Sequence, residues 1–170
     1  RVIDSYAMRI APTEVDFDQA GGTGIQFRNQ NQFTESSRIS GSYRCARGLE
    51  FISASQNPNS TPSATDSFHD TLIDHVHISA TDYCIKTGGV FQYCTLLKPT
   101  LQLDAAEADC IVFDSSRTEA TTIVGPKFES PADPGDVYAV REGPNYDAFY
   151  KPLLLNPRVG YGIDGVYRDK

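Results

Sequence analysis

The 170-residue sequence predicts an all-β fold, a right-handed single-stranded parallel β-helix, or solenoid, of about six rungs. Three observations support this prediction. Short strand-like segments recur along the chain, prolines stand at one phase of the recurrence, and turn-forming Gly, Pro, Ser, Thr, Asn and Asp are frequent. With 39% apolar and 22% charged residues, the composition favours many short strands over long amphipathic helices.

The recurring segments define one column of aliphatic residues. In three of them, at 24–27, 48–51 and 110–113, an aliphatic residue is followed two positions later by phenylalanine. The six equivalent positions are Ile25, Leu49, Ile85, Ile111, Val140 and Ile163. Stacked coils place these side chains in a single file that is shielded from solvent. The right-handed coil follows from the general preference of parallel crossover connections.

Four prolines mark a corner before a second strand in the same coils. They are Pro12, Pro99, Pro126 and Pro157, each of which is followed by an alternating stretch. Proline cannot donate to a strand ladder, so its recurrence at one phase indicates a turn between strands. Period-two alternation then points Val15, Phe17, Val76, Ile78, Leu101 and Leu103 inward. The same alternation points Asp16, His77 and Gln102 outward.

The length fits one domain spanning residues 1–170. The widest interval of the repeat contains a polar stretch rich in Ser, Thr, Asn and Pro, so residues 55–70 are predicted to protrude as a loop. Solenoids carry such insertions on one face, often the binding face. An excursion without a role is the alternative.

The four cysteines, Cys45, Cys84, Cys94 and Cys110, sit in or beside apolar segments. They lack the paired CxxC spacing of a zinc site, and we interpret them as buried free thiols. Cys84 and Cys110 precede equivalent positions of the repeat, which leaves a disulfide between stacked neighbours as an alternative. No metal and no cofactor is predicted.

The formal net charge is −7, and no run of Lys and Arg is present. This balance predicts no nucleic-acid partner, because phosphate binding depends on clustered positive charge. A polar, uncharged or cationic partner fits it better. No stretch approaches eighteen consecutive apolar residues, so no membrane insertion is expected.

From about Val2 to Tyr167 the chain resembles the pectate-lyase-like right-handed parallel β-helices, and among them bacteriophage tailspikes and tail fibres. The resemblance rests on the glycine-led aliphatic segments, the corner prolines and the corners rich in Asp, Asn and Ser. It implies bacterial polysaccharide as a partner, bound along a side groove and in some members cleaved. It also implies a homotrimer or contact with other virion subunits, in a virion tail or outside the cell after assembly in the host cytoplasm.

Glycoside hydrolysis requires two carboxyl groups that flank one bond, and neighbouring rungs can supply them. The candidate catalytic residues are Asp104, Asp109 and Glu129, although a solvated acidic surface is the alternative.

Histidines and tyrosines supply the candidate glycan-binding residues. His75 and His77 are two positions apart on one predicted strand and so share a face, but a third ligand for a metal is missing. Tyr146 and Tyr161 belong to a tyrosine-rich last repeat, where an aromatic ring with a hydroxyl suits either a sugar or a neighbouring subunit.

The leading hypothesis is a tailspike-like or tail-fibre-like β-helix that recognises bacterial surface polysaccharide. Whether it is also an enzyme, a polysaccharide hydrolase or lyase, stays open. The alternative is a non-catalytic structural or assembly module of a virion or another multi-subunit complex. The fold alone does not decide between them.

Overall fold

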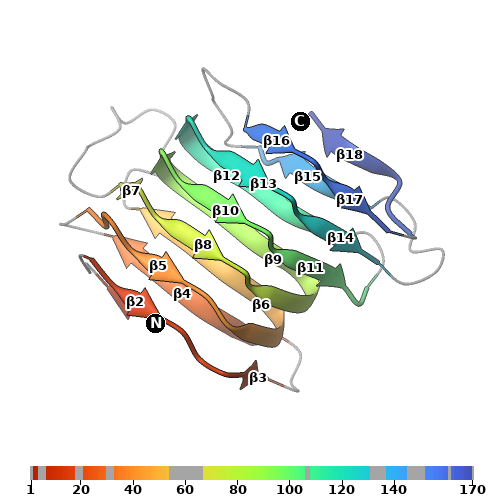
Figure 1. Cartoon of the computed structure of the whole chain (residues 1–170), viewed down its shortest axis with the longest axis horizontal. Helices are drawn as coiled ribbons and strands as arrows, with labels where there is room; N and C mark the ends of the chain where they lie inside the picture. Colours follow the sequence, from red (N-terminus) through yellow and green to blue (C-terminus); the bar gives the residue numbers. More distant parts are fainter. Residues whose placement is uncertain are drawn as a thin grey trace.

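The computed structural model describes residues 2–3, 7–17, 21–29, 33–53, 67–105, 108–130, 137–144, 152–160 and 162–169, with the side chains of 115–119 excepted. These residues form a right-handed parallel β-solenoid of about four turns that contains no helix (Figure 1). The all-β fold and the parallel coil predicted from the sequence are therefore confirmed. The described parts of the chain also offer no helix that could cross a membrane.

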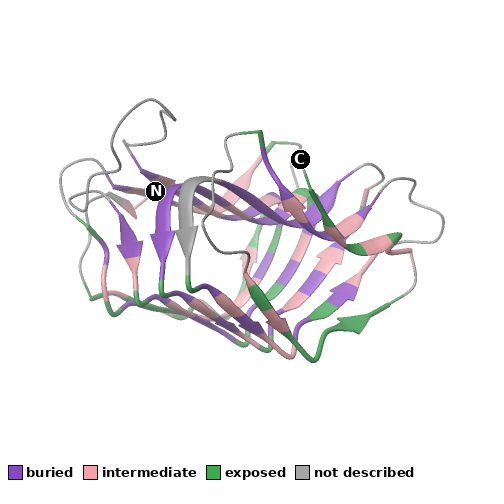
Figure 2. Cartoon of the chain, turned by 90° about the horizontal axis from the view of Figure 1, so that it is seen from above, coloured by how far each residue is buried: buried purple, intermediate pink, exposed green. Residues whose placement is uncertain are grey.

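The solenoid has two facing layers of strands. Among the described residues, six short strands form one sheet: β2 (Arg9–Ile10), β5 (Arg38–Ile39), β8 (Leu72–Asp74), β10 (Thr95–Leu97), β13 (Thr122–Val124) and β16 (Leu153–Leu155). The second sheet contains β1 (Val2–Ile3), β3 (Val15–Asp16), β4 (Thr23–Asn29), β6 (Ser42–Ser53), β7 (Phe68–His69), β9 (His77–Gln92), β11 (Thr100–Leu103), β12 (Asp109–Glu119), β14 (Lys127–Glu129), β15 (Tyr138–Glu142), β17 (Arg158–Val159) and β18 (Gly165–Arg168). Figure 2 shows the layers enclosing the buried interior.

The predicted count of about six rungs is too high. The short-strand sheet has six passages of the chain, yet the coil completes only about four turns. At the ends of the solenoid some strands are very short, as β2 of this sheet and β17 of the second sheet show with two residues each. Counting strand-like segments in the sequence therefore counts incomplete end coils as whole ones.

The short strands β5, β8, β10 and β13 each lie between two corners in which one residue has a positive φ, and β2 and β16 each have one such corner among the described residues. Before the strand this residue is Ala7, Ser36, Asp70, Tyr93 or Ala120, always three positions ahead of the inward-facing aliphatic residue of the strand. After the strand it is Gly41, His75, Lys98, Gly125 or Asn156 in successive coils. Non-glycine residues in this region cost roughly 1–2 kcal/mol each, so their recurrence at fixed phases shows that stacking overrides local preference.

The backbone ladder continues through these corners. The N–H of His75 donates to the carbonyl of Leu97 at 2.8 Å, that of Lys98 to Val124 at 2.7 Å, and that of Gly125 to Leu155 at 2.8 Å. At the second of these corners, the residue after the positive-φ position is Pro99, Pro126 or Pro157 in three successive coils. The missing N–H of proline thus falls where the chain turns, as predicted.

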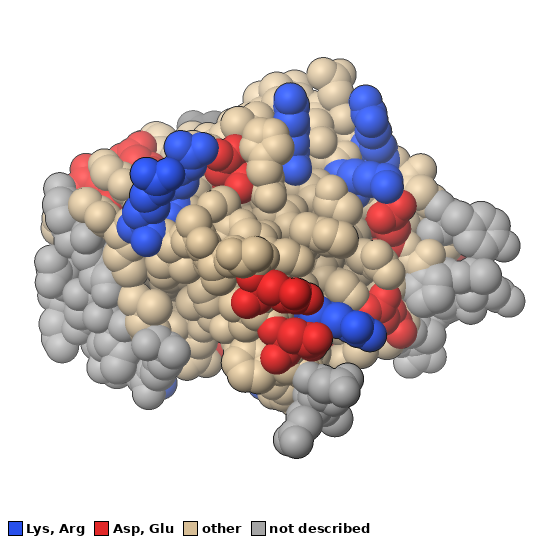
Figure 3. Space-filling model, turned by 60° about the horizontal axis from the view of Figure 1, so that its bottom comes forward, with Lys and Arg blue, Asp and Glu red and all other residues tan. Residues whose placement is uncertain are grey.

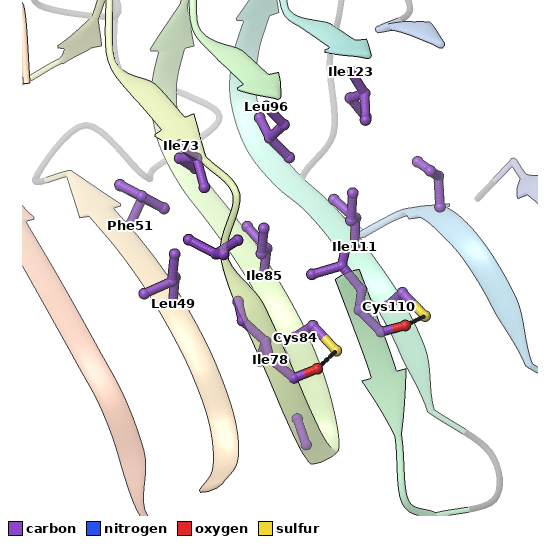
Figure 4. Packing of buried hydrophobic residues seen from close by; sticks show 14 of the residues in the cluster. Leu49, Phe51, Ile73, Ile78, Cys84, Ile85, Leu96, Cys110, Ile111 and Ile123 are labelled. Atoms are coloured by element: carbon purple, nitrogen blue, oxygen red, sulfur yellow. Dashed lines mark hydrogen bonds between the residues drawn. The ribbon is translucent and has the colours of Figure 1, made fainter. Parts of the chain in front are cut away.

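The central column of the core follows the predicted file with one exception. Ile25, Leu49, Ile85, Ile111 and Val140 are in register across adjacent strands. In Figure 4, Leu49, Ile85 and Ile111 lie in a row opposite the row formed by Ile73, Leu96 and Ile123. The next member is Tyr167 instead of Ile163, because the partner of Val140 in β18 is Tyr167. Ile163 lies before β18, partly buried against the core.

The predicted inward positions of the corner strands are also mostly confirmed. Val76, Ile78, Leu101 and Leu103 are fully buried, and Val15 packs partly buried against the core. Phe17 is the exception, with 47% of its surface exposed. It follows the two-residue strand β3, so alternation no longer governs its direction.

The four cysteines are free and buried, which confirms the reading of them as core thiols. Cys84 and Cys110 do stack on neighbouring strands, since Ile85 pairs with Ile111, but they form no disulfide. Their sulfurs lie near the carbonyls of Ile78, at 3.7 Å, and Leu101, at 3.9 Å (Figure 4). Burial raises the pKa of the Cys45 and Cys84 thiols and raises that of Cys94 to about 12.

The predicted protruding loop at 55–70 does not extend to residue 70, because its last residues belong to a strand. Residues 54–66 lie outside the described part of the chain. Phe68, however, is fully buried in β7 and contacts Phe51 with ring centroids 5.3 Å apart. β7 pairs with the end of β9, so these residues belong to the wall of the solenoid.

Replacing Ile85 with alanine should lower the free energy of unfolding by about 2–5 kcal/mol, because it opens a cavity in the middle of the column. Val166→Ala, at an exposed position of β18, is the matched control and should cost less than about 1 kcal/mol. Urea denaturation followed by circular dichroism measures both. Equal losses in the two variants would contradict the central file.

Thiol reagents should leave all four cysteines unmodified in the native protein at pH 8, because burial hides the four sulfurs and raises the thiol pKa of Cys45, Cys84 and Cys94. Four thiols per chain should react after unfolding in guanidinium. Rapid modification of any one of them under native conditions would be incompatible with the packing described.

Candidate functional site

The outward side of one corner carries the candidate site. Two columns of side chains face solvent there, and we call them together the corner face. The first column contains His77, Thr100, Lys127 and Arg158, and the second contains Ser79, Gln102 and Glu129. Both columns follow from the register of β9, β11, β14 and β17, since positions two residues apart on a strand share a face.

An acidic hollow of about 230 Å³ opens at the far end of this face. Gln102, Asp104, Glu129 and Ser130 line it. Asp104 accepts hydrogen bonds from the Ser79 hydroxyl and from Gln102 Nε2, the latter at 2.8 Å. The structure thus brings two of the three predicted catalytic carboxylates, Asp104 and Glu129, into one hollow.

The geometry of these two carboxylates favours contact with hydroxyl groups. Glu129 pairs with Lys127 at 2.7 Å, and sheet spacing places its Cα about 8 Å from that of Asp104. Asp104 is exposed, and its hydrogen-bond donors are polar side chains. Neither group has the apolar surroundings that keep a general acid protonated. The pair is better placed to accept hydrogen bonds from a ligand than to transfer a proton.

Asp109, the third predicted catalytic residue, does not share this hollow. It is 3% exposed and lies at the start of β12. Its carboxylate pairs with Arg141 Nε at 2.9 Å and accepts the backbone N–H of Tyr138 at 3.1 Å. These contacts tie β12 to β15, and they give Asp109 a structural role.

The predicted glycan-binding histidines are both exposed, but they are not on one strand. His75 is the positive-φ residue of its corner, and His77 begins β9. His75 Nδ1 lies 2.5 Å from a carboxylate oxygen of Asp74, which also pairs with Arg38. The histidine ring and then the guanidinium hold the pKa of Asp74 below its ordinary value. His75 is therefore anchored, while His77 heads the first column.

The predicted tyrosine contacts are not placed by the structure. Tyr146 and Tyr161 lie outside the described residues. Tyr167 of the same tyrosine-rich repeat points toward the core, and its hydroxyl donates to Glu142 at 2.9 Å.

A second hollow, of about 400 Å³, lies on the corner itself and was not predicted from the sequence. Its lining residues are Lys98, Pro99, Thr100, Gly125, Lys127, Asn156 and Arg158. Three of these side chains are cationic. In the sequence, the residues directly before and after each corner proline are the ones that line this hollow. Their proximity across three coils becomes visible only from the pairing register of the strands.

On the outer side of the long strands, several charged side chains lie in ion pairs or hydrogen bonds with neighbouring strands. Arg47 pairs with Asp82 at 3.1 Å and Lys86 with Asp114 at 3.4 Å. Glu50 accepts hydrogen bonds from Gln26 and from Tyr83, at 2.7 and 2.8 Å.

No protein-family model matches the chain, and comparison with curated proteins and with solved structures gives no match either. The pectate-lyase-like and tailspike resemblance therefore stays at the level of the parallel β-helix, and function has to be argued from the corner face. Within the described residues, no group of three or more His, Cys, Asp and Glu side chains is arranged to hold a metal ion.

Asp74→Asn should lower stability by about 1 kcal/mol at pH 7, because both partners of the carboxylate are about half exposed. The lowered pKa means that this contribution is present above about pH 4 and is lost as the pH falls through the folded-state pKa. The variant should therefore converge with the wild type in acid.

Denaturation midpoints measured between pH 3 and pH 7 check this dependence. Asp82→Asn, which removes a carboxylate from an exposed pair, is the control and should change the profile little. A loss in Asp74→Asn that is independent of pH would contradict the assignment.

Proposed function

We propose that this solenoid recognises bacterial surface polysaccharide along the corner face, in the manner of a bacteriophage tailspike or tail-fibre segment. The observation that carries the proposal is the pair of adjoining hollows, which run over three successive coils and have Lys98, Lys127, Arg158, Asp104 and Glu129 among their lining residues. The ion pair of Lys127 and Glu129 lies between them.

The chemistry of the face suits a chain of sugars. Thr100, Gln102 and Asn156 can both donate and accept hydrogen bonds, as hydroxyl-rich ligands require. Asp104 adds a carboxylate acceptor at one end. The columns repeat at the strand spacing of about 4.8 Å, so an extended polymer can meet equivalent side chains on successive coils.

Recognition is favoured over cleavage at this face. Asp104 is exposed and accepts a hydrogen bond from Gln102, and Glu129 lies in an ion pair with Lys127. Both carboxylates are therefore suited to accept hydrogen bonds from a ligand. A hydrolase needs one carboxyl group that is kept protonated, and an apolar setting for it is absent from the lining of the hollow.

Retention of the protein on immobilised capsular and lipopolysaccharide glycans tests the proposal. The wild type should bind at least one of them, and Asp104→Asn combined with Gln102→Ala should weaken binding about tenfold, since two polar contacts are removed. Thr13→Ala, at an exposed position away from the hollows, is the control. Size-exclusion chromatography of the glycan after incubation should show unchanged chain length.

Absence of binding to every glycan would overturn the proposed function, whereas shortened chains would retain the ligand class and overturn the assignment as a binder. If the double variant binds glycan as tightly as the wild type, the acidic hollow is not the place of recognition.

A second candidate is a structural or assembly module without a glycan site. It is favoured by the last coil, where Leu153, Leu155, Val159 and Val166 are exposed at 55%, 40%, 42% and 37%. Apolar side chains at the edge of parallel strands suit burial against another subunit. A concentration-dependent assembly that binds no glycan would favour this candidate, and the homotrimer expected from the resemblance is one such assembly.

A further inference from the structure

We call the second hollow, with its three cationic lining residues, the basic hollow. It exists because the middle one of three stacked corners has glycine and so lacks a side chain. The positive-φ residues Lys98, Gly125 and Asn156 stack on successive coils. Glycine in the middle of this column leaves a depression between its two neighbours. Thr100, Lys127 and Arg158 form the adjoining wall, in register on β11, β14 and β17.

The cations around this depression are poorly neutralised. Of the three, Lys127 pairs with Glu129, and no described carboxylate is within ion-pair distance of Lys98 or Arg158. Elsewhere on the same chain, Arg47, Lys86 and Arg141 each lie against a carboxylate. Among the described residues, the lining of the basic hollow contains no acidic side chain. Figure 3 shows groups of Lys and Arg side chains on one face of the molecule, with acidic side chains beside some of them.

We propose that this hollow binds an anionic substituent of the polysaccharide, a carboxylate, sulfate or phosphate group, between Lys98, Lys127 and Arg158. The inference rests on the proposed function, and it narrows the ligand from glycans in general to acidic ones. Arg158 offers a planar fork of donors that matches such oxygens, and the two lysines add point charges. Thr100 and Asn156 supply neutral hydrogen bonds.

Around the basic hollow, the local positive charge outweighs the negative net charge of the chain. The net charge of −7 acts over the whole surface, but salt screens it beyond about 8 Å at physiological ionic strength. An anion seated in the hollow lies among the side chains of Lys98, Lys127 and Arg158. The neighbouring acidic hollow then suits the uncharged hydroxyls of the next sugar. Together the two hollows favour a polymer in which anionic groups and uncharged hydroxyl groups alternate.

Two variants and one control test the anion site. Arg158→Gln removes a charge and keeps a polar side chain. Gly125→Asn fills the depression without removing any charge, and asparagine tolerates its φ of +57°. A Cβ at this position meets only Lys98 Cγ at 3.5 Å, an ordinary contact. Arg9→Gln removes a charge from exposed β2, away from the hollow.

The probes are two matched pairs: bacterial alginate with its carboxyl-reduced neutral form, and dextran sulfate with dextran. The wild type should bind at least one acidic polymer about tenfold more tightly than its neutral partner. Arg158→Gln and Gly125→Asn should each lose most of that preference, and Arg9→Gln should retain it. The pair that responds distinguishes a carboxylate from a sulfate ligand. Circular dichroism checks that each variant is folded.

Equal binding of acidic and neutral polymers would overturn the anion site. So would equal losses in Arg9→Gln and Arg158→Gln, because they would show attraction to overall charge. If capsular or lipopolysaccharide glycans are nevertheless retained, the proposed function stands while the anion site fails. If no glycan of any kind is retained, both fail.

Discussion

The central coils, those of β5, β8, β10 and β13, turn through the same pair of positive-φ corners, and this allows the backbone ladder to continue from one coil to the next. The hydrogen bonds from His75 to Leu97 and from Lys98 to Val124 are examples. Because each corner must copy the one below it, residues as different as His75, Lys98 and Asn156 adopt the same unfavourable φ. The core columns and the surface columns both result from this repetition.

The interior could be predicted because its chemical requirement is simple. Aliphatic residues at one phase and prolines at another were enough to locate Leu49, Ile85 and Ile111 in one file and to place the corners. The prediction failed where the repeat is weakest. Ile163 was chosen because it is aliphatic, but the register of β18 places the larger Tyr167 above Val140. Phe17 was assigned inward from a strand that ends too early.

The surface was harder to predict, because a function there depends on residues that meet across coils. Asp104 and Glu129 were named from the sequence and do share a hollow, whereas Asp109 looks equivalent in the sequence and is buried in an ion pair with Arg141. The cations of the second hollow lie 29 to 60 positions apart in the sequence, as Lys98 with Lys127 and Lys98 with Arg158 show. Their proximity follows from register, which depends on where each loop begins and ends.

The stacked corners also bear on how such a protein changes over time. Each coil contributes one residue to the column of Lys98, Gly125 and Asn156, and all three have a positive φ. A substitution at one level therefore alters a single position of the column and leaves the levels above and below intact. The chemistry of this surface can diversify by independent small steps, while the scaffold that presents it is inherited unchanged.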